Sequence, residues 1–280
     1  MLFDIQNIKM VISDLDGTLL NSDNKVSESD YAMLKQLGDS HIIRVLATGR
    51  SIFSANKVLE TDFPADFLIF SNGAGVMDWK TKQLILNYQL PAVKVEKIAK
   101  LLIQHKVDFM IQHLIPLNHH YFYHYSGGEN PDFFSRNRIY QKYISELNPK
   151  GEYEPASQFI AIIPDGFERF TFVKNLVSNN VENISIIRAT SPIDGKSIWL
   201  EIFPNEVSKG KTVKWLCNEL DISLQKTIGI GNDYNDLPLL EVTKYSYVVD
   251  NAPDELKKLF FVTQNNNNNG FSHIFKNVIR

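Results

Sequence analysis

Cysteine is nearly absent from this chain, which has 280 residues and a single cysteine, Cys217. One cysteine permits no internal disulfide and cannot form a zinc site made of several thiolates. Because Cys217 lies in the apolar-patterned stretch KTVKWLCNEL, we interpret it as a buried thiol rather than a reactive one. A disulfide scaffold and a cysteine zinc cluster are thereby excluded.

Long apolar runs and a strong net charge are missing too. No window approaches the ~20 apolar residues that a membrane span needs, and the start MLFDIQNIKMVISDLDGT lacks the uninterrupted apolar stretch of a secretory signal. The formal net charge of -3 gives no overall basic field of the kind that non-specific nucleic-acid binding uses. We therefore expect a cytoplasmic protein with a small-molecule partner and with neither a nucleic-acid nor a membrane partner.

The N-terminal part alternates short apolar runs with helical patterns. KMVISDL is a β-branched run that breaks at Gly17, and IIRVLATGR and DFLIFSNGAGVMD have the pattern of two further strands. The helical patterns SESDYAMLKQLGDS and SIFSANKVLETD separate these runs. This β-α-β-α-β order predicts an open, mainly parallel sheet, in which ligands bind at the carboxyl ends of the strands.

The pattern changes near residue 87. The amphipathic helix PAVKVEKIAKLLIQH begins a stretch in which short strands alternate with helical pieces, and the parallel pattern resumes from SIWLEIF onward. We therefore predict an α/β protein with a Rossmann-like parallel-sheet core in two parts, residues 1–86 and 191–280, and an inserted α+β module at 87–190. A core with one insert also suits the length of the chain.

Four short segments lie at predicted strand ends or at a helix start: DLDGT at 14–18, ATGR at 47–50, SKGK at 208–211 and GNDYND at 231–236. Each is a weak signal alone, since a pattern such as D-x-D-G-T arises in roughly one random chain of this length per several hundred. Their order along the chain and their shared placement at strand ends or a helix start make the combination informative. With SNGA at 71–74 and LEIFPNEVSKG at 200–210, they make the chain similar to the haloacid dehalogenase (HAD) superfamily, and within it to the Cof-type sugar-phosphatase-like branch with a type IIB cap.

The resemblance implies a phosphoryl-transfer site built on the first of these segments. Asp14 would be the nucleophile that forms an aspartyl-phosphate, and Asp16 the general acid for the leaving oxygen and then the base for water. Thr48 and the backbone amide of Gly49 would hydrogen-bond the transferring group, and Lys209 would neutralise its charge. The phosphate-contacting set that it implies is Leu15, Thr48, Gly49, Lys209 and Asn235.

The resemblance also implies Mg²⁺ as the cofactor, a hard ion that takes oxygen ligands. Its ligands would include the carboxylate of Asp14 and the backbone carbonyl of Asp16, and Asp236 would support the water shell of the metal. Most relatives have an aspartate where this chain has Asn232. Either the amide oxygen of Asn232 or the neighbouring Asp233 would therefore complete the site, and the sequence leaves both open.

Several other polar or aromatic stretches have a structural interpretation beside a functional one. Arg50 is either a phosphate contact or a surface residue after a turn. In HHYFYHY, alternation places His120 and His124 on one strand face and the tyrosines on the other, which fits ordinary polar contacts better than an aromatic substrate pocket or a metal site. Two further stretches are expected to be solvated: the helix face with Arg136, Arg138 and Lys142, and the asparagine-rich turn at 264–269.

The expected activity is Mg²⁺-dependent hydrolysis of small phosphate monoesters through an aspartyl-phosphate. By resemblance, sugar phosphates are the leading substrates, followed by phosphorylated cofactors such as pyridoxal phosphate or flavin mononucleotide. Two alternatives stay open. One is a phosphotransferase or phosphomutase, in which another hydroxyl accepts the phosphoryl group, and the other is a non-catalytic phosphometabolite-binding protein, suggested by Asn232.

Overall fold

The computed structural model describes residues 4–164 and 166–276. The chain divides into two compact units: the core, Met1–Leu86 with Ser208–Arg280, and the cap, Asn87–Val207. A mainly parallel sheet with helices in the core and an α+β cap confirm the predicted fold class. No helix in the described ranges is both long enough and apolar enough to cross a membrane.

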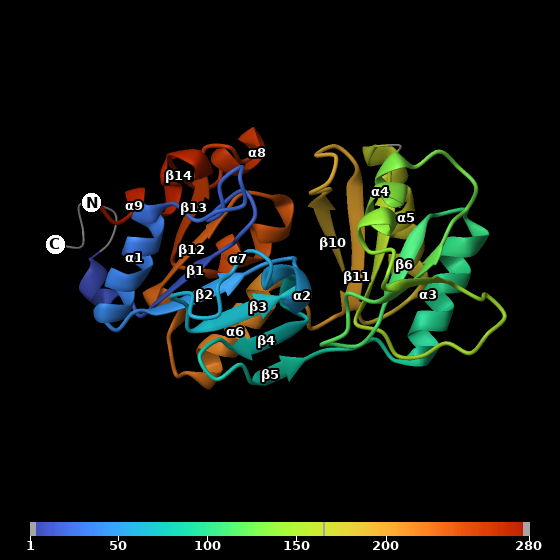
Figure 1. The fold of residues 1–280 in the computed structure, drawn as a ribbon, viewed down its shortest axis with the longest axis horizontal. Coiled ribbons are helices and arrows are strands. Elements are labelled where there is room, and N and C mark those ends of the chain that lie inside the picture. The colour runs from blue at the N-terminus through green and yellow to red at the C-terminus, as the bar shows by residue number, and fades with distance from the viewer. Residues whose placement is uncertain (1–3, 165, 277–280) are drawn as a thin grey trace. The chain divides into compact units, whose positions relative to one another are not determined.

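The core unit is built on an eight-stranded sheet with the strand order β14-β13-β12-β1-β2-β3-β4-β5 (Figure 1). The strands from β14 to β3 pair in parallel, and β4 is antiparallel to β3. All four residues of β1 are buried, as expected for a central parallel strand that is covered on both faces. The strands are β1 (Met10–Ser13), β2 (Ile43–Ala47), β3 (Phe67–Phe70), β4 (Gly75–Asp78), β5 (Leu84–Asn87), β12 (Thr227–Gly231), β13 (Tyr245–Val249) and β14 (Phe261–Thr263).

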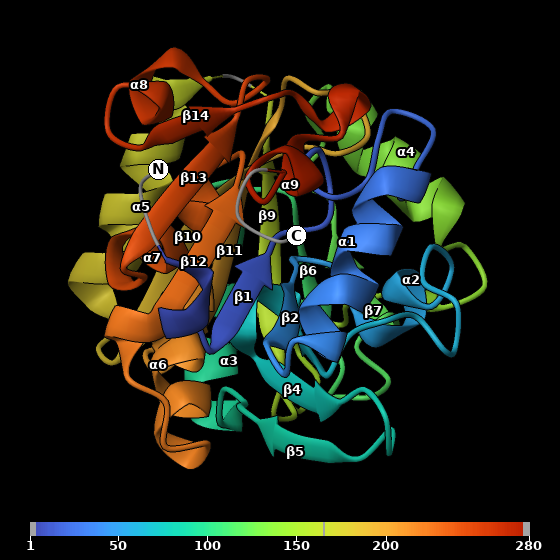
Figure 2. The same cartoon turned by 90° about the vertical axis from the view of Figure 1, so that its left-hand side faces the viewer.

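Helices cover both faces of the core sheet (Figure 2). Against one face pack α6 (Lys209–Glu219) and α7 (Leu237–Val242), where Val213 and Leu216 meet the apolar side chains of β1 and β2. On the other side lie α1 (Glu28–Asp39) and α9 (Gly270–His273), and the short α2 (Ile52–Ala55) and α8 (Asp254–Lys257) complete the unit. Cys217 packs with Val213 and Leu216 and is buried, which confirms the interpretation as a buried thiol. Burial raises the pKa of this thiol to about 11.

A partly buried ion pair joins β2 to the residue before β3. Arg44 donates from Nε to Asp66 Oδ2 at 2.9 Å and from Nη2 to Asp66 Oδ1 at 3.0 Å, and Lys80 Nζ lies 2.8 Å from Oδ1. Burial works to raise the pKa of Asp66, but the hydrogen bonds from Arg44 and Lys80 outweigh it and hold this pKa below its usual value. This bidentate contact fixes the register between β2 and β3 just before the ATGR segment.

The cap unit is built on a six-stranded sheet with the order β10-β11-β9-β6-β7-β8, antiparallel except for the parallel pair β7–β8. Helices α3 (Ala92–Gln104) and α5 (Phe167–Asn180) pack on one face, against alternate residues such as Ile111 and Phe159. Phe133 of α4 (Pro131–Ile139) packs on the opposite face, against Ile160. The strands are β6 (Phe109–Gln112), β7 (Tyr121–His124), β8 (Ile144–Glu146), β9 (Gln158–Ile163), β10 (Ile184–Thr190) and β11 (Ile198–Pro204).

The segment SIWLEIF does not resume the parallel core, so the prediction for it was wrong. It forms β11, which lies between β10 and β9 in the cap and pairs antiparallel with both. Every residue of β11 is buried, with Ile198, Leu200 and Ile202 in the layer of α3 and α5 and Trp199 in the layer of α4. Such a run has the pattern of a buried parallel strand. The boundary of the cap therefore lies after Val207, rather than at 190.

Two stretches predicted to be solvated are partly anchored. Arg136 is half-buried, and its guanidinium lies 4.7 Å from the ring centroid of Trp199 and 5.0 Å from that of Tyr140. Arg138 and Lys142 are exposed as expected, although Lys142 follows the end of α4. In the asparagine-rich run, Asn266 is buried and donates to a backbone carbonyl of the first loop.

Candidate active site

The carboxyl ends of β1, β2 and β12 bring the sequence segments together at one edge of the core sheet. The amide of Asp14, the residue after β1, donates to Ile230 O of β12 at 2.9 Å. Thr48, the residue after β2, donates in the same way to Ile69 O of β3 at 2.9 Å. This parallel register places DLDGT between ATGR on one side and GNDYND on the other.

A buried ammonium group lies between two carboxylates at this edge. Lys209 Nζ is 2.6 Å from Asp14 Oδ1 and 2.6 Å from Asp236 Oδ1, and the Lys209 side chain has no solvent exposure. Lys209 is the first residue of α6, and the hydroxyl of Ser208 begins that helix by accepting from the amide of Lys211 at 3.1 Å. The helix start therefore fixes the backbone from which Lys209 reaches both acids.

The electrostatics of this trio disfavour two ionised acids beside one cation. Burial is the main cause that raises the pKa of Asp14 to about 8, and the carboxylate of Asp236 adds to it, against the lowering effect of Lys209. Burial opposes the charge of Lys209, but the two neighbouring carboxylates outweigh it and raise its pKa above the usual value. One cation shared by two buried acids is a site that a further positive charge would stabilise.

The donor set at this edge fits a hard metal ion that keeps part of its water shell. Asp14 and Asp236 supply carboxylates and Asn232 an amide oxygen, and Mg²⁺ is commonly held through one or two carboxylates together with waters. Among the described residues, no group of three or more His, Cys, Asp or Glu side chains is placed to hold a metal. A partly hydrated ion suits these donors.

Asn232 and Asp233 have different surroundings. Thr18 Oγ1 donates to Asn232 Oδ1 at 3.0 Å, and a Cβ added to Gly17 would lie 2.6 Å from Asn232 Nδ2, so Asn232 packs against the DLDGT loop. Gly17 has a φ of +73°, which favours glycine there. Asp233 Oδ1 instead accepts from Tyr234 N at 2.8 Å and caps the short helix Tyr234–Asp236.

Asp16 lies in an ion pair that the sequence did not predict. Arg50 Nε donates to both carboxylate oxygens of Asp16, at 3.0 and 2.8 Å, and Arg50 also donates to Ser54 O at 3.2 Å. The two interpretations of Arg50 left open by the sequence were a phosphate contact and a surface position. The structure adds a third, in which ATGR contributes the group that holds the second aspartate of DLDGT.

The remaining segments meet around Gly49. Asn235 Nδ2 donates to Asn72 Oδ1 at 3.1 Å, and a Cβ on Gly49 would lie 3.4 Å from the Asn72 amide atoms. Thr48 is buried, its Oγ1 accepts from Arg50 N at 3.1 Å, and its carbonyl accepts from Asn72 N. The Leu15 side chain is fully buried, so only its backbone is positioned to face this edge.

A polar support behind the DLDGT loop was missed by the sequence analysis. Asn266 Nδ2 donates to Leu20 O at 2.9 Å, and the backbone amide of Asn266 donates to Asn251 Oδ1 at 3.1 Å. Asn251 Nδ2 in turn donates to Gly17 O at 2.7 Å. Side chains from the C-terminal part of the core therefore hold the loop after Asp16 in place. The sequence feature that could have indicated this role is the run of asparagines at 264–269, which we had expected to be solvated.

The histidines of the cap lie among aromatic rings. The His113 ring stacks on Phe122 with centroids 5.0 Å apart, and the His119 and His120 rings are 4.4 Å apart. Tyr121 is buried against α4, on the other face of the sheet. HHYFYHY thus supplies packing on one face and, through Phe122, part of a cavity wall on the other.

Comparison with known proteins finds similar sequences along nearly the whole chain. The family model described as haloacid dehalogenase-like hydrolase matches residues 11–275. A putative phosphatase of Streptococcus pyogenes serotype M6 is 26% identical, with 96% of this chain and 98% of that protein covered. A 5-amino-6-(5-phospho-D-ribitylamino)uracil phosphatase of Bacillus subtilis is 25% identical, with 97% of this chain and 98% of that protein covered.

Solved structures agree on the fold. A phosphatase of the haloalkanoate superfamily from Bacteroides thetaiotaomicron superposes with a TM-score of 0.77 at 22% identity, covering 98% of this chain and 96% of that one. A subclass IIB sugar phosphatase superposes with a TM-score of 0.75 at 18% identity, covering 96% of this chain and 98% of that one. The chain belongs to the haloacid dehalogenase-like hydrolases, as its sequence motifs predicted. Within that family, it is an enzyme of the phosphatase class.

Proposed function

We propose that this enzyme hydrolyses small phosphate monoesters with the help of Mg²⁺, and that Asp14 is its nucleophile. The observation that carries the proposal is the buried trio in which Lys209 Nζ lies 2.6 Å from both Asp14 and Asp236. Phosphoryl transfer depends on positioning and charge neutralisation, and this trio offers a fixed carboxylate beside a fixed cation. Sugar phosphates are the leading substrates, a choice supported by the sugar phosphatase among the similar structures and by the 5-amino-6-(5-phospho-D-ribitylamino)uracil phosphatase among the relatives.

The proposed reaction has two displacements. In the first, a carboxylate oxygen of Asp14 bonds to phosphorus, the bond from phosphorus to the leaving oxygen breaks, and Asp16 donates its proton to that oxygen. In the second, water attacks the phosphorus, Asp16 takes up a proton from the water, and inorganic phosphate leaves with Asp14 restored. Because Arg50 donates to both oxygens of Asp16, Asp16 must separate at least partly from Arg50 before it can donate a proton.

Other residues would bind and neutralise the transferring group. Lys209 and the backbone amide of Gly49 would contact it, together with Thr48, Asn235 and the backbone of Leu15. When bound, Mg²⁺ would offset negative charge on the phosphoryl oxygens. We assign its protein ligands to Asp14 and the backbone carbonyl of Asp16, with Asp236 supporting its waters.

Asn232 is our choice for the remaining metal position over Asp233. Its side chain packs against the DLDGT loop, whereas the Asp233 carboxylate caps its own short helix. An amide oxygen is a weaker ligand than a carboxylate, which predicts a site that needs more Mg²⁺ than a site with an aspartate there.

The direct test is hydrolysis of p-nitrophenyl phosphate by the purified protein in Mg²⁺. Asp14→Asn and the addition of EDTA should each abolish phosphate release, while Asp39→Asn, at the end of α1, serves as the matched control. Phosphate that appears on an added sugar rather than in solution would favour a phosphotransferase. Binding of sugar phosphates without turnover in any divalent ion would favour a binding protein.

A further inference from the structure

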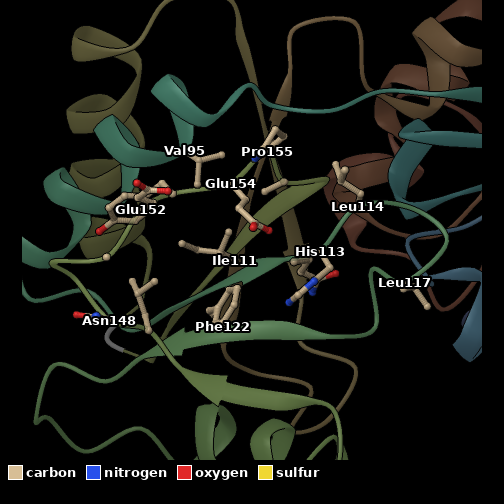
Figure 3. A pocket seen from close by; sticks show the side chains of 15 residues that line it. Val95, Ile111, His113, Leu114, Leu117, Phe122, Asn148, Glu152, Glu154 and Pro155 are labelled. Atoms are coloured by element: carbon tan, nitrogen blue, oxygen red, sulfur yellow. The ribbon is translucent and has the colours of Figure 1, made fainter.

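The cap contains a cavity of about 320 Å³ that the proposed reaction does not use (Figure 3). It is formed by cap residues alone, from α3, from β6 and the loop after it, from β7 and from the segment before β9. Its volume is at the lower end of the range typical of small-molecule sites. The lining residues are Val95, Ile111, Gln112, His113, Leu114, Leu117, Phe122, Leu147, Asn148, Gly151, Glu152, Tyr153, Glu154, Pro155 and Ala156.

The walls of this cavity are apolar and its charged groups are acidic. Val95 and Ile111 are buried, and Phe122 adds an aromatic ring beside them. Glu152 and Glu154 are exposed at the opening, and Figure 3 shows Glu154 together with Ile111, His113 and Phe122. None of the fifteen lining residues is lysine or arginine. The lining therefore presents an apolar floor under a negatively charged rim.

His113 does not reverse this charge near neutral pH. Burial is the main cause that lowers its pKa, and the neighbouring His120 lowers it further, against the raising effect of Glu154. The ring is also held in place by stacking on Phe122, with centroids 5.0 Å apart. A neutral imidazole can accept a hydrogen bond from a ligand, as the carboxylates can.

We propose that this cavity is a binding site for a small organic amine, in which an apolar body fills the pocket and a protonated amino group lies beside Glu154. Burial of the body against Val95, Ile111 and Phe122 supplies most of the attraction. The amino group gains the acceptors at the rim, and the rings of Phe122 and Tyr153 can attract a cation through their faces.

Charge separates this ligand from the substrate of the enzyme. A phosphate monoester is anionic, and two glutamates without a nearby basic group among the lining residues would repel it. The core site differs because it holds a buried cation, Lys209, between its acids. The cavity therefore recognises a different class of molecule, and this inference does not depend on the proposed hydrolysis.

Two probes with one ring system and opposite charges test the inference: tryptamine and indole-3-propionate. Isothermal titration of the full chain should show tryptamine binding at least tenfold more tightly than indole-3-propionate. Glu154→Gln should weaken tryptamine binding about fivefold, the effect of losing one partly solvated charge contact. Glu182→Gln removes an exposed glutamate of the same unit that does not line the cavity, and it should leave binding unchanged.

Nuclear magnetic resonance of the isotope-labelled protein locates the site. Tryptamine should shift the amide signals of 111–122 and 147–156, because these segments line the cavity. Equal binding of the two probes, no binding of tryptamine at millimolar concentration, or an unchanged affinity in Glu154→Gln would each overturn the proposal. Shifts confined to 14–18 and 231–236 would also overturn it, because they would place the amine in the core.

Discussion

Asn232→Asp introduces a carboxylate at the position that we propose for the remaining metal ligand. It should lower the stability of the protein without metal and tighten the binding of Mg²⁺. In the protein alone, the new charge is added next to Asp236, whose Oδ2 accepts from the backbone amide of Asn232 at 2.8 Å. Two unit charges ~4 Å apart repel by about 4 kcal/mol at an effective dielectric constant of 20. Because Asn232 is partly exposed, solvent screens this repulsion, and we expect the variant to lose about 1–2 kcal/mol of unfolding free energy without Mg²⁺.

With Mg²⁺ the same carboxylate becomes a ligand. Replacing an amide oxygen by a charged one should lower the Mg²⁺ concentration for half-maximal activity about ten- to hundredfold, which corresponds to about 1.4–2.8 kcal/mol of tighter binding. The Thr18 hydroxyl, which donates to Asn232 Oδ1, can donate to a carboxylate in the same place. Local geometry should therefore survive the substitution.

Two measurements check this prediction: the Mg²⁺ dependence of p-nitrophenyl phosphate hydrolysis, and the thermal unfolding midpoint with and without Mg²⁺. Asp233→Asn is the matched control, because asparagine also caps helices and the Asp233 carboxylate lies at the start of the helix Tyr234–Asp236. The reasoning is refuted if Asn232→Asp leaves the Mg²⁺ requirement unchanged while Asp233→Asn raises it. That outcome would assign the ligand to Asp233.

Four other substitutions test the surrounding framework. Lys209→Met leaves two buried carboxylates without their cation and should cost about 3–5 kcal/mol of unfolding free energy in urea denaturation, so a loss below about 1 kcal/mol would contradict the described trio. Asp66→Asn should destabilise the protein by about 1–3 kcal/mol at pH 7. Because the folded pKa of Asp66 is lowered, its stabilisation is present above the unfolded value of about 3.9 and is lost as the pH falls through the folded value, so wild type and variant should converge in acid-range unfolding experiments. Asn266→Ala should cost about 1–3 kcal/mol through the lost buried hydrogen bond, whereas the exposed neighbour Asn268→Ala should change stability by less than about 0.5 kcal/mol. Arg50→Ala should lower kcat about ten- to hundredfold with a smaller change in KM. Arg50→Lys should recover only part of the lost kcat, because lysine lacks the planar guanidinium group. Equal activity of the wild type and both variants would remove Arg50 from the mechanism.

The core was predictable because its strands and its polar segments give independent signals that agree. Short β-branched runs between helical patterns predict parallel strands, and parallel strands place their carboxyl ends at one edge. The structure brings Asp14, Thr48 and Asn232 to that edge from three different strands. Strand order, rather than the distance along the chain, is what makes such residues neighbours.

The end of the cap was not predictable from periodicity. The residues of β11 alternate between two apolar layers, Ile198 and Leu200 facing α3 and α5, and Trp199 facing the layer of α4. A strand that is apolar on both faces has the same sequence pattern in a parallel core as in the middle of an antiparallel sheet. Only its partners distinguish the two, and those partners, β10 and β9, lie elsewhere in the sequence.

The support of the DLDGT loop shows a second limit, which concerns side chains that work over long separations. An asparagine carries both a donor and an acceptor, so a run of asparagines can fasten a loop as well as face solvent. Asn266 reaches Leu20 across 246 positions in the sequence, and Arg50 reaches Asp16 across 34. Both contacts act on the residues that follow Asp14, so the placement of the proposed general acid depends on groups whose local sequence gives no indication of that role. The geometry of this site therefore depends on distant parts of the core unit, with DLDGT supplying the proposed reacting groups and distant polar side chains fixing where they lie.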